Sequence, residues 1–335
     1  MLTDLIESPL RSARTRTLRI GLFGLGVVGS GVWSIIKQKR GEFRRRFGVD
    51  VQIAGVCVRD ITKQRAVEIK AETLFDSHDA LLDDDSIDIV LELVGGRYEA
   101  LGIIERGLES RKHVITANKL VLAHELPRLE HRAERQGIRL LYGASVCGSV
   151  PVLRTLDELR IGDRVQSLMG IVNGSTNFVL TLMSESGASY SDALVEARRL
   201  GFLEADPTLD VSGQDAAQKL CVLSYHAFGV HLLPDQILTS GIESVTSEQI
   251  ARTKANGMTL KLIASAERTP NGAHASVGLR EVPNTHLFAN TRDEFNAIEI
   301  QTAHAGPQML YGKGAGSLPT ASAVISDLVE LLKEL

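Results

Sequence analysis

The stretch Leu18–Phe23, followed at once by Gly24-Leu25-Gly26-Val27-Val28-Gly29, decides the fold of this chain. The first part is a short apolar run typical of a buried strand, and apolar residues recur at helical spacing after the glycines, up to Ile36. A strand, a tight glycine turn and a helix in this order favour dinucleotide binding over a purely structural turn. The glycines let the backbone approach a pyrophosphate, which the free N–H groups of the helix N-terminus then face. The residues expected to contact it are Gly24, Gly26, Val27, Val28 and Gly29.

The chain up to residue 150 continues to alternate between apolar strands and longer helices. This rhythm is typical of a doubly wound parallel sheet. Further strands are expected at Val51–Val58, Ile87–Leu93, His113–Ala117 and Ile138–Tyr142, with a helix at Tyr98–Ser110.

The rhythm changes after Pro151, which opens a helix up to Arg160. A second glycine-rich stretch, Tyr311–Pro319, precedes a terminal helix over Thr320–Leu335. Its glycines suit a backbone that lies against a flat ligand. A flexible connector is the alternative interpretation. We predict an α/β, Rossmann-type doubly wound parallel sheet in residues 17–150 and 306–335, an α+β catalytic domain in residues 151–305 and an N-terminal extension in residues 1–16. Strands are expected in the second domain at Arg164–Val172, Met258–Ala266, His274–Val282 and Phe295–Ala303, and helices at Ser175–Ser186, Ser191–Leu200 and Gln214–Phe228.

Composition agrees with a globular, two-domain protein. Of the 335 residues, 44% are hydrophobic, 23% are charged and only 4% are aromatic, so an aliphatic core is expected. With 37 basic and 41 acidic residues the net charge is −4, which argues against a nucleic-acid partner. Three cysteines without paired spacing argue against a disulfide framework or a zinc site, and no apolar run approaches the roughly 20 residues that span a bilayer. We expect a cytoplasmic protein with no membrane contact.

The end of the second strand bears on the choice of dinucleotide. An acid at this position binds the ribose hydroxyls of NAD, whereas an arginine accommodates the 2′-phosphate of NADP. The chain has both, as Arg59 and Asp60, with Lys63 close behind. Arg59 favours NADP, and NAD remains the alternative.

Acidic residues are concentrated between Glu204 and Asp215, with Asp210 between them and Lys219 one helical turn further on. Asp215 and Lys219 are spaced i, i+4, so they share one face of the predicted helix. An exposed ion pair is the simpler interpretation. However, crowded carboxylates are costly unless a cation lies among them, and a substrate with an amino group would supply one.

A second lysine, Lys119, ends the segment Thr116-Ala-Asn-Lys119 directly after a predicted parallel strand. Ligands of open α/β sheets bind outside the carboxyl ends of the strands, which places Lys119 near a nicotinamide. A lysine in a dry cleft can exchange a proton with an alcohol. A surface lysine is the alternative.

In these blocks the chain resembles the homoserine dehydrogenases. The resemblance runs from about Arg19 to the end and is carried by GLGVVG, the glycine pair after Val94, TANK, VNGSTNFVLTLM, GFLEADPTLDVSGQDAAQKL and YGKGAGSLPTASAVISDL. It implies reversible, NAD(P)-dependent oxidation of L-homoserine to L-aspartate 4-semialdehyde in threonine, methionine and isoleucine biosynthesis, by a homodimer built through the second domain. The resemblance implies proton transfer by Lys219 and Lys119. It implies substrate binding by Glu204, Asp210, Asp215, Asn173, Gly174 and Thr176. The cofactor-binding residues that it implies are Gly95, Thr116, Lys119, Gly314 and Gly316, in addition to the first glycine loop, Arg59 and Lys63.

The block Tyr142–Val150 departs from the family, which often has a Glu there. Family members can bind a monovalent cation such as Na⁺ through backbone carbonyls of this block, and carbonyl ligation survives the loss of a side chain. The positions implied are Gly143, Val146, Gly148 and Val150.

Two other functions compete with this interpretation. A semialdehyde dehydrogenase would use a cysteine thiolate to form an acyl-enzyme, and Cys147 is the candidate, although a buried core cysteine is the simpler interpretation. A non-catalytic regulator that senses a dinucleotide would keep the glycine loop without the chemistry.

Overall fold

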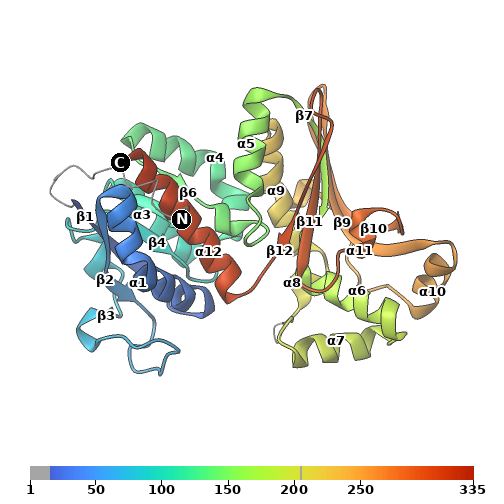
Figure 1. Cartoon of the computed structure of the whole chain (residues 1–335), viewed down its shortest axis with the longest axis horizontal. Helices are drawn as coiled ribbons and strands as arrows, with labels where there is room; N and C mark the ends of the chain where they lie inside the picture. The colour runs from blue at the N-terminus through green and yellow to red at the C-terminus, as the bar shows by residue number, and fades with distance from the viewer. Residues whose placement is uncertain (1–15, 204–205) are drawn as a thin grey trace, which may run out of the picture.

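The computed structural model describes residues 16–203 and 206–335, which form two lobes joined in the middle of the molecule (Figure 1). The first lobe is built on a six-stranded sheet in the order β3-β2-β1-β4-β5-β6, and every neighbouring pair is parallel. This order confirms the predicted Rossmann-type fold. The strands are β1 (Arg16–Phe23), β2 (Val49–Cys57), β3 (Leu74–Phe75), β4 (Ile89–Glu92), β5 (His113–Thr116) and β6 (Leu140–Leu141).

Helices cover both faces of the first sheet, because apolar side chains project from its strands to either side. On one face α1 (Val27–Phe47) and the C-terminal α12 (Ser317–Glu334) share an aliphatic core with Leu18, Ile20 and Leu22 of β1. The other face packs against α3 (Tyr98–Glu109) and α4 (Lys119–Gln136). A short helix, α2 (Asp79–Leu82), and a 3-10 turn, Ala71–Thr73, lie between β2 and β4.

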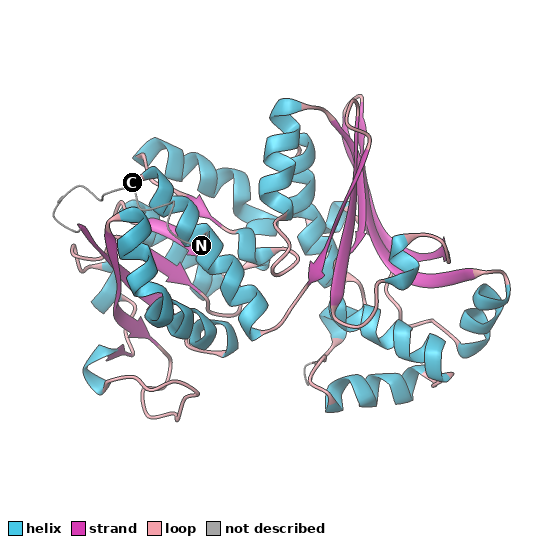
Figure 2. Ribbon diagram, viewed as in Figure 1, coloured by secondary structure: helices cyan, strands magenta, loops and turns pink. Residues whose placement is uncertain are grey.

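The second lobe is built on a mixed sheet in the order β12-β11-β7-β9-β10-β8, where only β8 and β10 pair in parallel. Figure 2 shows that this sheet is tall and strongly twisted. Some helices lie between it and the first lobe, and others lie below it in this view. The strands are β7 (Val165–Ile171), β8 (Leu238–Thr239), β9 (Met258–Thr269), β10 (Gly272–Pro283), β11 (Phe295–Thr302) and β12 (Pro307–Lys313). The helices are α5 (Val152–Gly162), α6 (Gly174–Ser186), α7 (Tyr190–Arg199), α8 (Thr208–Val211), α9 (Gln214–Phe228), α10 (Ser247–Ala255) and α11 (Leu287–Asn290), with 3-10 turns at Gly143–Ser145 and Pro234–Gln236.

One aliphatic core runs through both lobes, because α5 and α9 stand between the two sheets. Leu156 of α5 and Leu220 of α9 are fully buried in the same cluster as Val114 of the first sheet and Leu262 of the second. A core that continues across the junction holds the lobes together without a flexible tether.

The second crossing between the lobes lies later in the chain than the sequence suggested. The sequence prediction places residues 306–335 in the first domain, but Pro307–Lys313 forms β12 and pairs with β11 along its length. The chain returns to the first lobe only after Lys313, through the glycines that precede α12 (Figure 1). An edge strand that begins at a proline and alternates between exposed and half-buried residues gives a weak sequence signal.

No helix in the described part of the chain is long and apolar enough to cross a membrane.

Candidate active site

The first glycine loop lies where the strand order of the first sheet reverses, between the carboxyl ends of β1 and β4. Packing requires two of its glycines: a Cβ on Gly24, whose φ is +91°, would lie 2.5 Å from the carbonyl oxygen of Leu93, and one on Gly29 would lie 2.2 Å from that of Gly24. Gly26 and Gly95 have no atom within 4 Å of an added Cβ. The open space beside these two glycines is where a ligand could approach the backbone.

The second glycine-rich loop meets the first. Ser317, the first residue of α12, donates its hydroxyl hydrogen bond to the carbonyl of Val27 at 2.8 Å. Val27 is 70% exposed, and Val28 beside it is half-buried in the first turn of α1. Gly316 has a φ of +117°, and a Cβ on Gly314 would lie 2.2 Å from the amide of Asn296. Both glycine loops therefore reach the same end of the first sheet.

Three predicted charged residues meet where the lobes face each other. The carboxylate of Asp215, in the first turn of α9, is paired with Lys119 Nζ at 3.0 Å through one oxygen and with Lys219 Nζ at 2.7 Å through the other. Lys119 is the first residue of α4, so it comes from the first lobe. Lys219 also donates to the carbonyl of Val172 at 2.7 Å. The cation expected among the carboxylates is thus supplied, in this structure, by the two lysines.

Asn173 joins a second carboxylate to this centre. Its Nδ2 donates to Asp215 at 2.8 Å and to Asp210 at 2.6 Å, while its Oδ1 caps α6 by accepting from the N–H of Thr176 at 2.8 Å. The hydroxyl of Thr176 is buried and bonded to Asn173 as well. A Cβ on Gly174 would lie 2.9 Å from the carbonyl of Glu294, so the helix begins in close contact with the loop before β11. Glu204, the remaining predicted substrate ligand, lies outside the described residues.

The charges of this centre are strongly coupled. Burial alone would raise the pKa of Asp215, but Lys219 and Lys119 outweigh it and hold that pKa well below its usual value. Burial, followed by the charge of Asp215, raises the pKa of Asp210. For Lys219, burial acts to lower the pKa, yet Asp215 dominates and the pKa is raised. Asp215 therefore bridges the two lysines, and any group that competes for its carboxylate weakens the interaction that raises the pKa of Lys219.

The residues expected to select the dinucleotide lie on the surface beyond β2. Arg59 is paired with Glu99 of α3, which also contacts His78 at 3.2 Å. The Arg59 side chain is 76% exposed, and Lys63 is exposed on the same loop. Asp60 accepts from the backbone and hydroxyl of Thr62, at 2.8 and 2.6 Å. Its carboxylate thus shapes the loop, and the two cations face solvent.

Cys147 does not have the environment of a nucleophile. Its side chain is fully buried, and burial raises the pKa of the thiol to about 11. A thiolate is needed for attack, so the semialdehyde dehydrogenase interpretation is not supported. The φ of Cys147 is +58° and that of Gly148 is +55°, in a turn where a Cβ on Gly148 would lie 2.6 Å from the carbonyl of Gly314.

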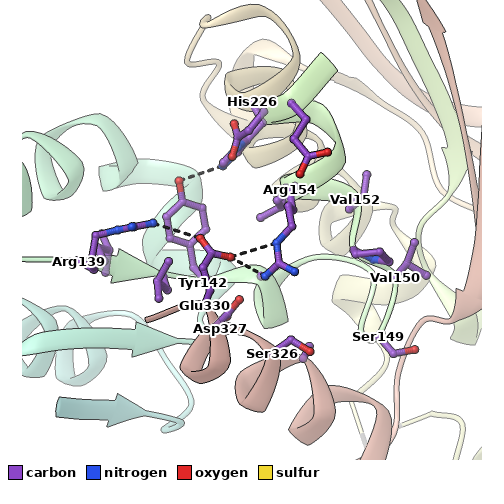
Figure 3. Close-up of a pocket in the computed structure, with 18 of the residues that line it drawn as sticks. Arg139, Tyr142, Ser149, Val150, Val152, Arg154, His226, Ser326, Asp327 and Glu330 are labelled. Atoms are coloured by element: carbon purple, nitrogen blue, oxygen red, sulfur yellow. Dashed lines mark hydrogen bonds and ion pairs between the residues drawn. The ribbon is translucent and has the colours of Figure 1, made fainter. Parts of the chain in front are cut away.

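The turn around Gly143 borders a cavity of about 290 Å³ at the junction of the lobes (Figure 3). Gly148 and Val150 line this cavity too, whereas Val146 is fully buried and is not among its lining residues. A Cβ on Gly143 would lie only 2.6 Å from Asp327 Oδ1. The missing side chain therefore makes room for a carboxylate from α12. Neither Lys119 nor Lys219 is among the described residues that line this cavity. The charged centre is therefore a separate feature of the junction.

Two residues of this region were not predicted from the sequence. Glu92 ends β4 and is fully buried, where it accepts the hydroxyl hydrogen bond of Thr116. Asn118 lies between Thr116 and Lys119 and caps α4 by accepting from the N–H of Val121 at 3.1 Å. The available signal was the acid at the end of an otherwise apolar run, because a lone carboxylate there must find donors.

Comparison with known proteins identifies the family to which both halves of the chain are similar. Residues 24–143 match the model described as "Homoserine dehydrogenase, NAD binding domain", and residues 151–329 match the one described as "Homoserine dehydrogenase". The homoserine dehydrogenase of Bacillus subtilis (strain 168) is 40% identical over 320 residues, which cover 96% of this chain and 74% of the relative.

Solved structures of homoserine dehydrogenases are similar to this chain in fold as well. A crystal structure of a homoserine dehydrogenase from Thiobacillus denitrificans superposes with a TM-score of 0.89 at 36% identity, covering 95% of this chain and 74% of the other. A hyperthermophilic archaeal homoserine dehydrogenase in complex with NADPH superposes with a TM-score of 0.80 at 26% identity, covering 95% of this chain and 98% of the other.

Proposed function

Because the chain belongs to the homoserine dehydrogenase family, whose members are NAD(P)-dependent oxidoreductases, we propose that it interconverts L-homoserine and L-aspartate 4-semialdehyde in threonine, methionine and isoleucine biosynthesis. The observation that carries the proposal is the meeting of Lys119 and Lys219 at Asp215. Lys119 is the first residue of α4, shortly after β5 of the Rossmann-type sheet, and Lys219 lies in α9 of the second lobe. A CH–OH group between them would lie beside the place where ligands of such sheets bind.

Asp215 and Asp210 supply the negative charge for the substrate's ammonium group. An ammonium that paired with Asp215 would compete with the lysines for it, which would weaken the interaction that raises the pKa of Lys219. Substrate binding would thereby prepare a lysine to accept the proton of the hydroxyl group. Asn173 would hold the two carboxylates apart and in place. Glu204, Gly174 and Thr176 complete the proposed substrate side of the site.

The open spaces at Gly26 and Gly95 fit a dinucleotide that binds across the two glycine loops. A nicotinamide cofactor bound there would accept or return the hydride. The first loop, Gly24–Gly29, would hold its phosphates, and Thr116, Lys119, Gly314 and Gly316 would lie beside the nicotinamide. We favour NADP over NAD, since Arg59 and Lys63 are exposed at the end of β2 and could bind a 2′-phosphate.

The enzyme assay is the direct test. Purified protein with L-homoserine should reduce NADP faster than NAD, measured by the absorbance of the reduced nicotinamide. Lys219→Ala should lower kcat by at least about 100-fold, the contribution typical of a positioned proton-transfer group, and leave NADP binding nearly unchanged. Absence of reduction with either dinucleotide would contradict the proposed function, and an unaltered kcat in Lys219→Ala would remove this lysine from proton transfer.

We also propose that a monovalent cation such as Na⁺ binds at the junction. Asp327 Oδ2 is buried without a hydrogen-bond partner in the described part of the chain, and Asp327 lines the cavity with Gly143, Gly148 and Val150 (Figure 3). The backbone carbonyl oxygens of Gly143, Val146, Gly148 and Val150 would hold the ion. Its role would be to stabilise the turn that these residues form. If so, Na⁺ should raise the Tm more than choline does at equal ionic strength, and equal Tm values would contradict the site.

We also propose a cytoplasmic homodimer. The second lobe would supply the dimer surface, and a groove on its sheet, lined by Ser167, Ser265 and Ser276 among others, supports this proposal. Sedimentation analysis would test the dimer, and a monomer at micromolar concentration would contradict it.

A further inference from the structure

Glu92 is a buried acid that the proposed reaction does not use. It is the last residue of β4, beside the point where the strand order reverses, and its side chain is fully buried. Burial raises its pKa to about 7. A carboxyl group in this position is costly unless hydrogen-bond donors satisfy both of its oxygens.

The donors come from the loop after β4 and from the last residue of β5. The hydroxyl of Thr116, which lies opposite Glu92 in the neighbouring strand, donates to Oε2, and the backbone N–H of Val94 donates to Oε1 at 2.8 Å. Val94 lies in the loop after β4, and Thr116 is the last residue of β5, directly before the loop that leads to Lys119. One carboxyl group therefore holds both loops at the carboxyl edge of the sheet.

Asn118 extends this connection to the lysine. Its backbone N–H donates to Thr116 Oγ1 at 2.9 Å, and its side-chain amide donates to the carbonyls of Val94 at 3.2 Å and Gly96 at 2.7 Å. The next residue is Lys119, whose Nζ reaches Asp215. A continuous set of hydrogen bonds thus leads from Glu92 through Thr116 to Asn118, which directly precedes Lys119 in the chain.

We propose that Glu92 is a positioning residue. Through Thr116 and Asn118 it fixes the position of Lys119 relative to the Val94–Gly96 loop. The inference rests on the proposed function, because these two loops border the place assigned to the nicotinamide and the reacting hydroxyl. A reacting group that moves by about 1 Å can lose about 100-fold in rate, so the effect of Glu92 is on turnover even though it lies beneath the site.

Glu92→Gln is the main test, since glutamine keeps the shape but has one oxygen and one NH₂ group. It cannot accept from Thr116 and Val94 on separate oxygens. We expect kcat to fall about 10- to 100-fold and the dissociation constant for NADPH to rise by a smaller factor, because Glu92 contacts the loop that contains Gly95 and not the first glycine loop proposed to hold the phosphates. Asp50→Asn is the matched control, because it alters another buried carboxylate of the same sheet at its opposite edge. It should lower stability and leave kcat unchanged.

Thr116 gives a second test if Glu92→Gln fails to fold. Thr116→Val removes the hydroxyl group that links Glu92 to Asn118 and should lose kcat as Glu92→Gln does, whereas Thr116→Ser keeps it and should lose less. The double variant Glu92→Gln/Thr116→Val should be no worse than the more impaired single variant, because both break one chain of contacts. Additive losses, or wild-type kcat in folded Glu92→Gln, would overturn the proposal.

Crystal structures separate this proposal from the proposed function. If the wild-type protein does not oxidise homoserine, the function fails, yet the position of Lys119 can still be compared. A Lys119–Asp215 distance that lengthens from 3.0 Å in Glu92→Gln supports the positioning role. Loops that superpose unchanged would overturn it.

Discussion

Asp50 carries a buried charge that is fully matched by its neighbours. It lies near the start of β2 and is 4% exposed. Both of its oxygens accept from Arg40, at 2.6 Å each, and one of them accepts from Arg44 at 2.8 Å, while Gln52 donates at 2.6 Å. These hydrogen bonds, those from Arg40 first, hold the pKa of Asp50 well below its usual 3.8.

We therefore predict that Asp50→Asn lowers the free energy of unfolding by about 2 to 3 kcal/mol at neutral pH, since hydrogen bonds to a charged group are lost. A carboxyl group with a depressed pKa in the folded state stabilises the protein above the unfolded-state pKa and stops doing so as the pH falls through the folded-state pKa. The difference between wild type and variant should thus be constant from about pH 7 to about pH 5 and shrink below about pH 4. Urea unfolding across this range measures it, and a difference independent of pH would contradict the assignment.

At the residue scale, the sequence predicts those site residues whose partners are close in the chain or whose motif is distinctive. The i, i+4 spacing of Asp215 and Lys219 was enough to place them on one helical face, and they form an ion pair. Glu92 was not predicted because one of its donors, Thr116, lies in the neighbouring strand and is brought to it only by the folded sheet. The N–H of Val94 is close in the chain, but burial of the carboxylate also needs the donor to its second oxygen, which no local pattern contains.

The packing of α12 on α1 depends on one glycine. A Cβ on Gly31 of α1 would lie 2.8 Å from Ala321 Cβ and 3.2 Å from the carbonyl of Ser317, both in α12. We predict that Gly31→Val lowers the free energy of unfolding by about 2 to 3 kcal/mol, because its branched side chain forces the helices apart. It should also weaken NADP binding, since Ser317 holds the second glycine loop against Val27.

Gly102→Ala is the control for this prediction. Gly102 lies within α3, where an added Cβ meets no atom within 4 Å, so alanine should stabilise the protein by up to about 1 kcal/mol. Denaturant unfolding and titration with NADPH would measure both effects. Equal stability of the two variants would show that the contact between α1 and α12 is not tight.

At the scale of elements, the first half of the fold was predictable because buried parallel strands alternate with helices of distinct periodicity. The strand after Thr17, the glycine turn and α1 follow directly from that pattern. The edge strand β12 did not, since its residues are half-buried and its pairing partner β11 decides its conformation. Its neighbour in the chain, the loop at Gly314–Gly316, was recognised by composition alone.

At the scale of the whole molecule, a buried polar chain connects the two lobes. The hydroxyl of Tyr142, directly after β6, donates to Glu130 of α4 and lies 2.9 Å from His226 Nε2 of α9. On its other side, His226 Nδ1 lies 2.6 Å from Asp157 of α5. Figure 3 shows Tyr142 and His226 pointing toward each other across the junction. Burial, together with Glu130, raises the pKa of Tyr142 well above its usual value, so the phenol keeps its proton.

We predict that Tyr142→Phe loosens the junction, because a buried donor and acceptor lose their common partner, at a cost of about 1 to 3 kcal/mol. The amides of α5 and α9 should exchange with solvent faster, whereas those of α1, which packs on the far side of the first sheet, should keep their protection. Since α9 also carries Asp215 and Lys219, a looser junction reaches the charged centre from the second lobe. Tyr98→Phe, at a side chain that is 84% exposed, is the control and should change neither quantity. Hydrogen exchange measured on both variants decides the point: uniform acceleration in all helices, or none in α5 and α9, would show that the junction is held by its aliphatic core alone.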